Sequence, residues 1–368
     1  MNIDTVVKDK LIVFLKKWWL FVLFFGVLFT NLLAVNASAF FETCYSSTIY
    51  PVITQILTHL TNWMPFSLTE VLVIALMAFG LIGIVLAILR KWQFKKFIAL
   101  LIQLLALIYV CFYLFWGFNY YRLPITKRMD LPAVAIDSTM FRMTLSQVLD
   151  EANAAYVPIR NLDKDQIDHA IERGFKRVAQ QLNLDLPGGL RNPKTLLFNI
   201  FLDKTLTSGF FSPITHELHI NKSLLFVEYP FTLAHEKSHQ MGIANEAEAN
   251  FLAYLVCLAS GDPAAQYSAR MEVLGEFLGR GRRILSDYAD FRARIAPGIV
   301  ADFRAINQRW RRHQGAVSKV SSQAYDRYLK ANRISEGIKN YRGVVEMVIR
   351  WKTGADGEME IENPASEK

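Results

Sequence analysis

The residues best suited to chemistry stand close together in residues 234–241, which read AHEKSHQM. His235 and His239 are four positions apart, so on a helix their imidazoles share one face about one turn (roughly 5–6 Å) apart, the span that suits two ligands of one Zn²⁺. Glu236, beside them, is a carboxylate that can take a proton from a water activated by the metal. The alternative is a pair of surface histidines, but HExxH arises by chance in well under ~1% of such chains. The motif therefore predicts a zinc site with Glu236 as general base.

The chain after the motif can double back and bring a second helix against the first. Gly242 suits the left-handed turn that ends a helix, and Asn245 is a suitable N-cap for the next one. The following residues, 246–260, read EAEANFLAYLVCLAS and are expected to be helical. A catalytic zinc site usually has three protein ligands and a water, so this second helix is the expected source of the third ligand.

Of the two glutamates in this second helix, Glu246 is the predicted third ligand. Glu246 and Asn250 are four apart and share one face, whereas Glu248 points roughly 200° away from Glu246. Only one of the two carboxylates can therefore face the metal. Asn250 would then lie behind Glu246 as a hydrogen-bonding partner for a ligand histidine. Glu248 is expected to be a solvated or salt-bridged residue.

At these residues the chain resembles the gluzincin clan of zinc metallopeptidases, whose later helix carries the third ligand in NExxxD or ExxAD. NEAEAN matches that pattern, with Asn250 where the clan usually has Asp. The competing metzincin pattern, HExxHxxGxxH, fits as far as Gly242 but would place its third ligand at Asn245, and a neutral Asn is a poor zinc ligand. The whole layout also looks like a family of bacterial multi-pass membrane proteins of unknown function. These resemblances imply a zinc-peptidase-like activity with one Zn²⁺ per chain, and they name no substrate.

The elements before residue 122 are expected to cross a membrane. The composition is 52% hydrophobic, which is too apolar for an ordinary soluble protein, and the excess lies in this first third of the chain. Three stretches of 24, 19 and 25 residues carry no charge, and each can cross about 30 Å of hydrocarbon. The predicted transmembrane helices are residues 18–41, 71–89 and 97–121.

The distribution of lysine and arginine predicts how these spans are oriented. Four lysines precede the first span, and four basic residues fill the loop between the second and third, whereas residues 42–70 have none. The positive-inside rule then places the N-terminus in the cytoplasm and everything after Arg122 outside it, in a protein of the inner membrane. Residues 37–39 read like a signal-peptidase site, but the apolar stretch is longer than a usual signal peptide, which favours a retained anchor.

The loop between the first two spans carries a further helix signal at residues 51–64. Val52, Ile56, Leu60 and Trp63 belong to one apolar stripe, and polar residues such as Thr54 lie opposite. This spacing is typical of a helix in the membrane interface. A re-entrant helix or one packed on protein is the alternative.

Residues 122–355 are long enough to form a domain with its own core. Helical periodicity is strong at residues 166–182, and strands are expected at residues 195–200 and 214–221. A strand before the HExxH helix could pair with an extended peptide substrate through its main chain. The predicted fold class is mainly α, with three transmembrane helices before a largely helical α+β zincin-like domain that has a small sheet. Residues 356–368 are acidic and expected to be a disordered tail.

The C-terminal helices are basic, and their charge indicates which partners they could attract. Residues 270–352 contain 18 Lys and Arg against 8 Asp and Glu. A solvated basic face is one interpretation, and attraction to anionic lipid or an acidic wall polymer is the other. The lipid bilayer and a peptide or protein substrate are the expected partners, and nucleic acid is not expected on that side of the membrane.

The predicted function is a membrane-anchored zinc metallopeptidase that hydrolyses peptide bonds outside the cytoplasm. Glu236 would deprotonate the attacking water and pass the proton to the leaving amine. One alternative is a sensor or transducer whose zinc domain cleaves itself or a partner. Another is a non-enzymatic membrane scaffold with a structural metal site, although such a site needs no base at position 236. By the gluzincin resemblance a later residue would steady the oxyanion, and the sequence leaves these candidates: Tyr288, Tyr325, Tyr328 and Tyr341.

Overall fold

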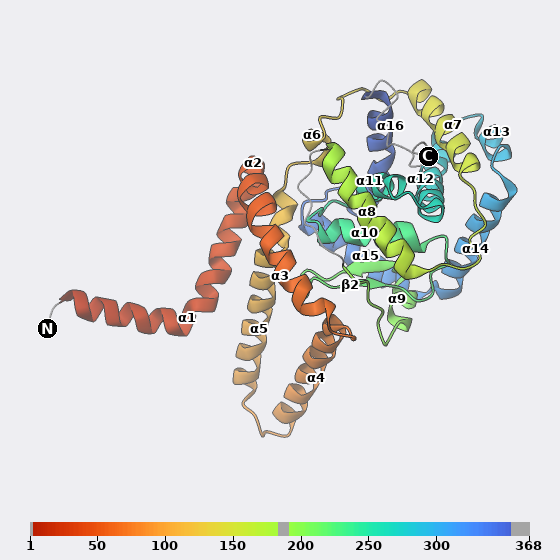
Figure 1. Cartoon of the computed structure of the whole chain (residues 1–368). Coiled ribbons are helices and arrows are strands. Elements are labelled where there is room, and N and C mark those ends of the chain that lie inside the picture. Colours follow the sequence, from red (N-terminus) through yellow and green to blue (C-terminus); the bar gives the residue numbers. More distant parts are fainter. Residues whose placement is uncertain (1–2, 183–190, 355–368) are drawn as a thin grey trace.

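The computed structural model describes residues 3–182 and 191–354, and in this part the chain is mostly helical with one two-stranded sheet. This confirms the expectation of a mainly α protein with a small sheet. In Figure 1 a helical hairpin and a bent N-terminal arm extend from one side of a rounded group of helices. The elements of the arm and hairpin are, in chain order, α1 (Ile3–Leu33), η1 (Ala34–Asn36), α2 (Ser38–Phe40), η2 (Phe41–Ile49), α3 (Tyr50–Asn62), α4 (Leu68–Ile88), α5 (Phe94–Phe115) and η3 (Gly117–Tyr121).

The remaining elements form the rounded group, and its core is built around α11. They are α6 (Ile125–Arg128), α7 (Ser138–Ala154), α8 (Lys164–Leu182), α9 (Ile200–Thr205), β1 (Gly209–Phe211), β2 (Leu218–Ile220), α10 (Tyr229–Gln240), α11 (Glu246–Ala259), α12 (Pro263–Ile284), α13 (Tyr288–Ala293), α14 (Pro297–His313), α15 (Ala316–Ala331), η4 (Gly337–Gly343) and α16 (Val344–Gly354). Helix α11 packs against α8, α10 and α12, and its side chains are buried almost all round. The helix expected at residues 166–182 is confirmed as α8. The predicted tail, residues 356–368, lies outside the described residues.

Two helices, α4 and α5, are long and apolar enough to span a membrane. The predicted first span, residues 18–41, is not one straight helix, because α1 ends at Leu33 and the chain turns through the polar sequence that includes Asn36 and Ser38. Residues 18–33 and 38–62 pass the same length and composition test only as a pair, bent by 120°. Membrane association by two spans is therefore supported, and the three-span arrangement is not confirmed.

The sheet is smaller than the sequence predicts. Strands β1 and β2 pair antiparallel, with Phe210 opposite His219. The strand expected at residues 195–200 is wrong: only Lys194 forms an isolated bridge to His219, and the next residues turn into α9. The physical reason is that the amides of residues 197 and 198 donate to the Glu70 carboxylate instead of to a neighbouring strand. The strand expected at residues 214–221 is cut to β2, since His216 adopts a φ of 55° and turns the chain.

Candidate metal centre

The two helices that carry the predicted ligands meet as the sequence indicates. Helix α10 ends at Gln240, and Gly242 follows with a φ of 82°, a conformation that favours glycine. A Cβ on Gly242 would also lie 2.9 Å from the Tyr50 ring. Asn245 then caps α11, and its side chain accepts a hydrogen bond from the amide of Glu248. The chain therefore doubles back within five residues and lays the start of α11 against α10.

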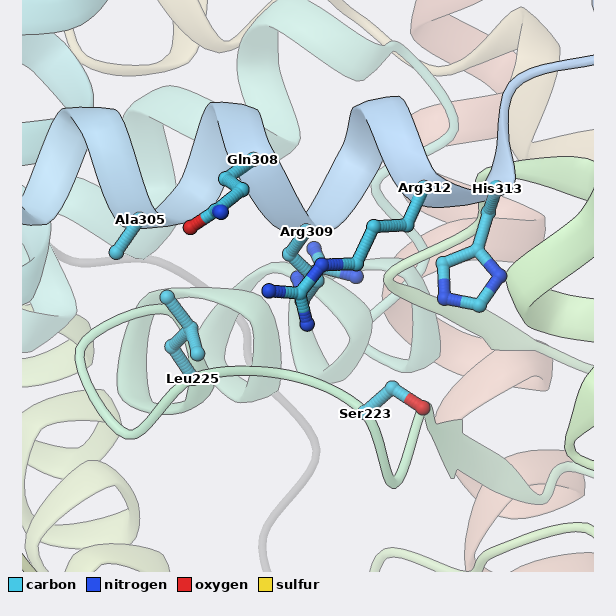
Figure 2. Close-up of a pocket in the computed structure, with 7 residues that line it drawn as sticks. All are labelled: Ser223, Leu225, Ala305, Gln308, Arg309, Arg312 and His313. Atoms are coloured by element: carbon cyan, nitrogen blue, oxygen red, sulfur yellow. The ribbon is translucent and has the colours of Figure 1, made fainter.

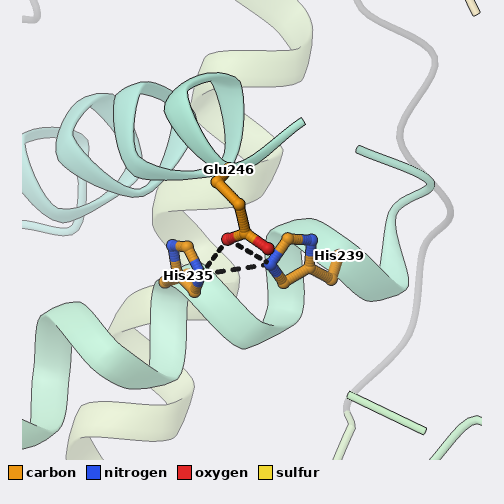
Figure 3. Close-up of side chains that lie close together, drawn as sticks. All are labelled: His235, His239 and Glu246. Carbon is orange, nitrogen blue, oxygen red and sulfur yellow. Dashed lines mark hydrogen bonds and ion pairs between the residues drawn. The ribbon is translucent and has the colours of Figure 1, made fainter. Parts of the chain in front are cut away.

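This turn brings His235, His239 and Glu246 together (Figure 3). The two histidine Nε2 atoms are 3.1 Å apart, and each lies 3.3 Å from Glu246 Oε2. In a tetrahedral zinc site with bonds of roughly 2.0–2.1 Å, neighbouring ligand atoms are about 3.3–3.4 Å apart. The three atoms thus form one face of such a tetrahedron. The donor set and its spacing fit one metal ion, and all three residues line the same cleft.

Neighbouring groups orient two of the three side chains. His239 Nδ1 lies 2.7 Å from the carbonyl oxygen of Ile243, a contact in which the ring nitrogen donates, and this leaves Nε2 free to face the cluster. The hydroxyl of Tyr325 donates to Glu246 Oε1 at 2.5 Å, so Oε2 is the oxygen that faces the histidines. Burial alone would raise the pKa of Glu246, but the two histidines outweigh it and hold the pKa well below its usual range. Glu246 is therefore a carboxylate anion that faces the two imidazoles.

Glu236 is a residue of α10, and its side chain lies beside the cluster on the side that faces β1. Its side chain is buried, and a Cβ on Gly209 would lie 2.9 Å from Glu236 Cγ. Burial raises the pKa of Glu236, while His235, His239 and the Phe211 amide oppose the rise. A carboxyl group with a raised pKa in a cleft is a better proton acceptor than an exposed one, which is the property a general base needs.

The other two polar residues of α11 take different places. Glu248 points away from the cluster, toward the amide of Ile125 and the guanidinium of Arg128, and burial raises the pKa of Glu248 to about 7. Asn250 is buried and lines the same cleft as Glu246. The role predicted for Asn250, as a hydrogen-bonding partner of a ligand histidine, stays a prediction.

The cluster lies in a cleft of about 810 Å³, and the elements that line it are η3, α9, β1, α10, α11, α12, α14 and α15. Of the four candidate tyrosines, Tyr325 and Tyr328 line this cleft, Tyr288 is not among its lining residues, and the side chain of Tyr341 lies outside the described part of the chain. A second hollow of about 340 Å³, between α14 and the loop before α10, contains none of the predicted site residues (Figure 2). The predicted site residues therefore lie in the larger cleft.

The C-terminal end of α10 is held by the membrane-side segments. The last carbonyl groups of a helix have no partner within the helix. Here Trp116 Nε1 donates to the carbonyl of His239 at 2.8 Å, and the Tyr50 hydroxyl donates to the carbonyl of Gln240 at 2.6 Å. Arg122 donates to the next carbonyl, that of residue 241, at 3.1 Å. These contacts join residues more than 100 positions apart, so no local pattern in the sequence marks them.

A buried ion cluster fixes the opposite face of α10. Lys237 has no exposed surface, and its ammonium group pairs with the carboxylates of Asp168 and Glu172 on α8. Burial raises the pKa of Asp168, and Lys237 opposes this rise. Because an unpaired charge in this position would be costly, the pairs favour the one rotation of α10 that turns His235 and His239 toward α11.

Comparisons with known proteins place the chain in a family. The family described as "Protein of unknown function (DUF3810)" matches residues 45–349, so the chain belongs to that family. The matched region includes α4, α5 and all residues of the cluster. No curated protein and no solved structure matches the chain with significance.

Proposed function

We propose that this member of the DUF3810 family is a membrane-anchored zinc metallopeptidase of gluzincin type that hydrolyses peptide bonds outside the cytoplasm. The observation that carries the proposal is the triangle of His235 Nε2, His239 Nε2 and Glu246 Oε2 with Glu236 beside it in one cleft. A purely structural metal site has no use for a buried carboxylate next to an open position. The same residues are those that the HExxH and NEAEAN motifs single out.

The proposed chemistry divides among these residues. His235, His239 and Glu246 would hold the ion, and when bound the zinc would supply a Lewis acid that lowers the pKa of water and polarises the scissile carbonyl. Glu236 accepts a proton from the attacking water and passes it to the leaving amine. Burial of Glu236 keeps bulk water from competing for that proton. Tyr325 and Tyr328 line the same cleft and are the candidates from the sequence for steadying a developing oxyanion.

Strand β1 has one edge that does not pair with β2, and on that edge the Phe211 amide already hydrogen-bonds to the Glu236 carboxylate. The Asn221 amide donates to the Ser208 carbonyl and the Ser212 amide donates to the Glu217 carbonyl, each at 2.9 Å. In an antiparallel pair the hydrogen-bonded positions alternate, so the main-chain groups of Gly209 and Phe211 point away from β2. Both residues line the cleft. A substrate backbone could therefore pair with β1 and lie across the cluster, largely independently of its sequence.

The proposed topology has three spans, with the N-terminus and the loop at residues 90–96 in the cytoplasm. In support, α4 begins and α5 ends beside the rounded group of helices, while the basic loop lies at the far end of the hairpin (Figure 1). The third crossing would be the segment predicted at residues 18–41, whose first part, residues 18–33, is one arm of the bent pair. This arrangement keeps the cluster on the side opposite to the basic loop.

The two glutamates of α11 provide a matched test of the ligand assignment. In detergent-purified full-length protein, Glu246→Ala is expected to lose zinc at chelator concentrations at least about tenfold lower than wild type requires, because a ligand atom is removed. Glu248→Ala should retain zinc as wild type does, since its carboxylate faces Arg128. If Glu248→Ala loses the metal and Glu246→Ala keeps it, the ligand assignment is wrong.

A further inference from the structure

A short segment beside the cleft exposes large apolar side chains. We call residues 197–201 the apolar turn: Leu197, Phe198, Ile200 and Phe201 are 77%, 56%, 56% and 61% exposed. The backbone of this turn is hydrogen-bonded: the Phe201 amide donates to the Phe198 carbonyl, and the amides of Leu197 and Phe198 donate to Glu70. A contiguous patch of this kind on a protein surface marks a contact with another apolar phase or molecule.

The apolar turn is fixed to the first turn of a membrane span. Glu70, in the first turn of α4, accepts hydrogen bonds from the amides of Leu197 and Phe198, both at 2.8 Å. Phe66, just before α4, and Trp63 are 53% and 73% exposed and extend the apolar surface toward α3. The turn is therefore held at the level at which α4 enters the membrane.

Helix α3 continues the same surface, and in this helix polar side chains are buried while apolar side chains are exposed. Its threonines face the protein: Thr54 is buried against His216 Nδ1, and Thr58 accepts a hydrogen bond from Gln240. Its apolar side chains Val52 and Ile56 face outward, each 55% exposed. A helix in water exposes its polar face, whereas a helix against lipid does the opposite.

The mouth of the cleft lies next to this surface. Phe201 belongs to the apolar turn and also lines the cleft that contains His235 and Glu246. On the other side of the cluster Trp116, which directly follows α5, donates to the carbonyl of His239. The residue after α5, Trp116, thus contacts the helix that carries the histidines, and the cleft borders the apolar turn that Glu70 of α4 holds.

From this arrangement we infer that the apolar turn and the outer face of α3 insert into the outer leaflet and hold the mouth of the cleft at the bilayer surface. The substrate class that fits is a membrane-anchored polypeptide, cut in the extended stretch that leaves the bilayer. The lipid contact follows from continuity with α4 and does not depend on catalysis. The substrate class rests on the proposed peptidase function.

The lipid contact can be tested without any activity. Full-length protein in which Cys44, Cys111 and Cys257 are replaced by Ser would receive Phe198→Cys, carry an environment-sensitive fluorophore there and be placed in phosphatidylethanolamine/phosphatidylglycerol vesicles that contain nitroxide lipid. We expect strong quenching at position 198. The control, Met143→Cys on α7, is 68% exposed but far from α4 and should be quenched weakly. Equal quenching at the two positions would overturn the inference.

The substrate class is tested in the same vesicles. One peptide sequence is presented either free in solution or fused to a single transmembrane helix, to wild type and to a Leu197→Gln/Phe198→Gln variant. Wild type should cleave the anchored form about tenfold or more faster, because anchoring raises its effective concentration at the cleft. The variant should lose this preference and keep its rate on the free peptide. Equal rates for the two forms in wild type would contradict the substrate class. Quenching at position 198 without cleavage of either form would instead contradict the peptidase function and leave the lipid contact standing.

Discussion

Glu246 has two oxygens, and the structure gives them different partners. Oε2 faces both histidines, and Oε1 accepts from the hydroxyl of Tyr325 on α15. A carboxylate that is held in this way can offer one oxygen to a metal ion without first losing rotational freedom. We therefore propose Tyr325 as a positioning residue for the proposed ligand Glu246, in addition to its place in the lining of the cleft.

Replacement of Tyr325 tests this positioning role. Tyr325→Phe removes the hydroxyl and keeps the ring, so we expect zinc affinity to fall roughly 10–100-fold, the usual effect of losing a partner of a metal ligand. The matched control is Tyr328→Phe on the same helix, because its hydroxyl hydrogen-bonds with Tyr120 instead of Glu246. Zinc retention is measured by competition with a chelator. If Tyr325→Phe slows hydrolysis but binds zinc as wild type does, Tyr325 acts on the substrate and not through Glu246.

At the scale of elements, β1 and α10 approach so closely that only glycine fits at position 209. A Cβ on Gly209 would lie 2.8 Å from the His219 carbonyl oxygen and 2.9 Å from Glu236 Cγ. A Cβ at this position therefore displaces both the Glu236 side chain and the β1–β2 backbone beside it. We expect Gly209→Ala to keep zinc and to lower the turnover number about 100-fold, as a displaced general base would.

The control for Gly209→Ala comes from α12. Gly279 has nothing within 4 Å of its Cβ position, so Gly279→Ala should keep full activity and be as stable as wild type or about 0.5–1 kcal/mol more stable. The measurements are turnover number, zinc content and thermal unfolding of the two variants. Unchanged turnover in Gly209→Ala would mean that Glu236 is not the base.

The elements also show which signals in the sequence are local. The break at Gly242, the cap at Asn245 and the start of α11 depend on neighbouring residues, and they could be predicted. The sequence could not show that residues 195–200 fail to form a strand. The Glu70 carboxylate, which takes hydrogen bonds from their amides, lies more than 120 positions away. The same holds for Trp116, whose contact with the His239 carbonyl exists only in the folded chain.

At the scale of the whole molecule, the membrane segments and the site form one unit. Tyr50, Trp116 and Arg122 satisfy the last carbonyl groups of α10, and Arg122 also pairs with Glu42 at 3.0 Å. A fragment that begins after Arg122 would remove these side-chain donors from the carbonyls of Gln240 and Met241, whereas the His239 carbonyl would keep its bond from the Gly242 amide. The site therefore depends on the segments before residue 123.

The proposed topology is tested with reporter fusions. A reporter that is active only after export should be active when fused at about residue 130 and inactive in the loop at residues 90–96, because the basic loop is retained in the cytoplasm. A reporter that requires the cytoplasm should show the reverse pattern. Cytoplasmic activity at residue 130 would place the cluster on the other side of the membrane and contradict the proposal.

The central claim is that Glu236 acts as the base beside a zinc ion that it does not bind. The most direct measurement is zinc content together with peptide hydrolysis for purified wild type, Glu236→Gln and His239→Ala. We predict about one zinc per chain in wild type and in Glu236→Gln, with hydrolysis lowered by roughly 10²–10⁴ in Glu236→Gln, and loss of both zinc and hydrolysis in His239→Ala. Loss of zinc from Glu236→Gln as complete as that from His239→Ala, or hydrolysis by Glu236→Gln at the wild-type rate, would contradict the claim.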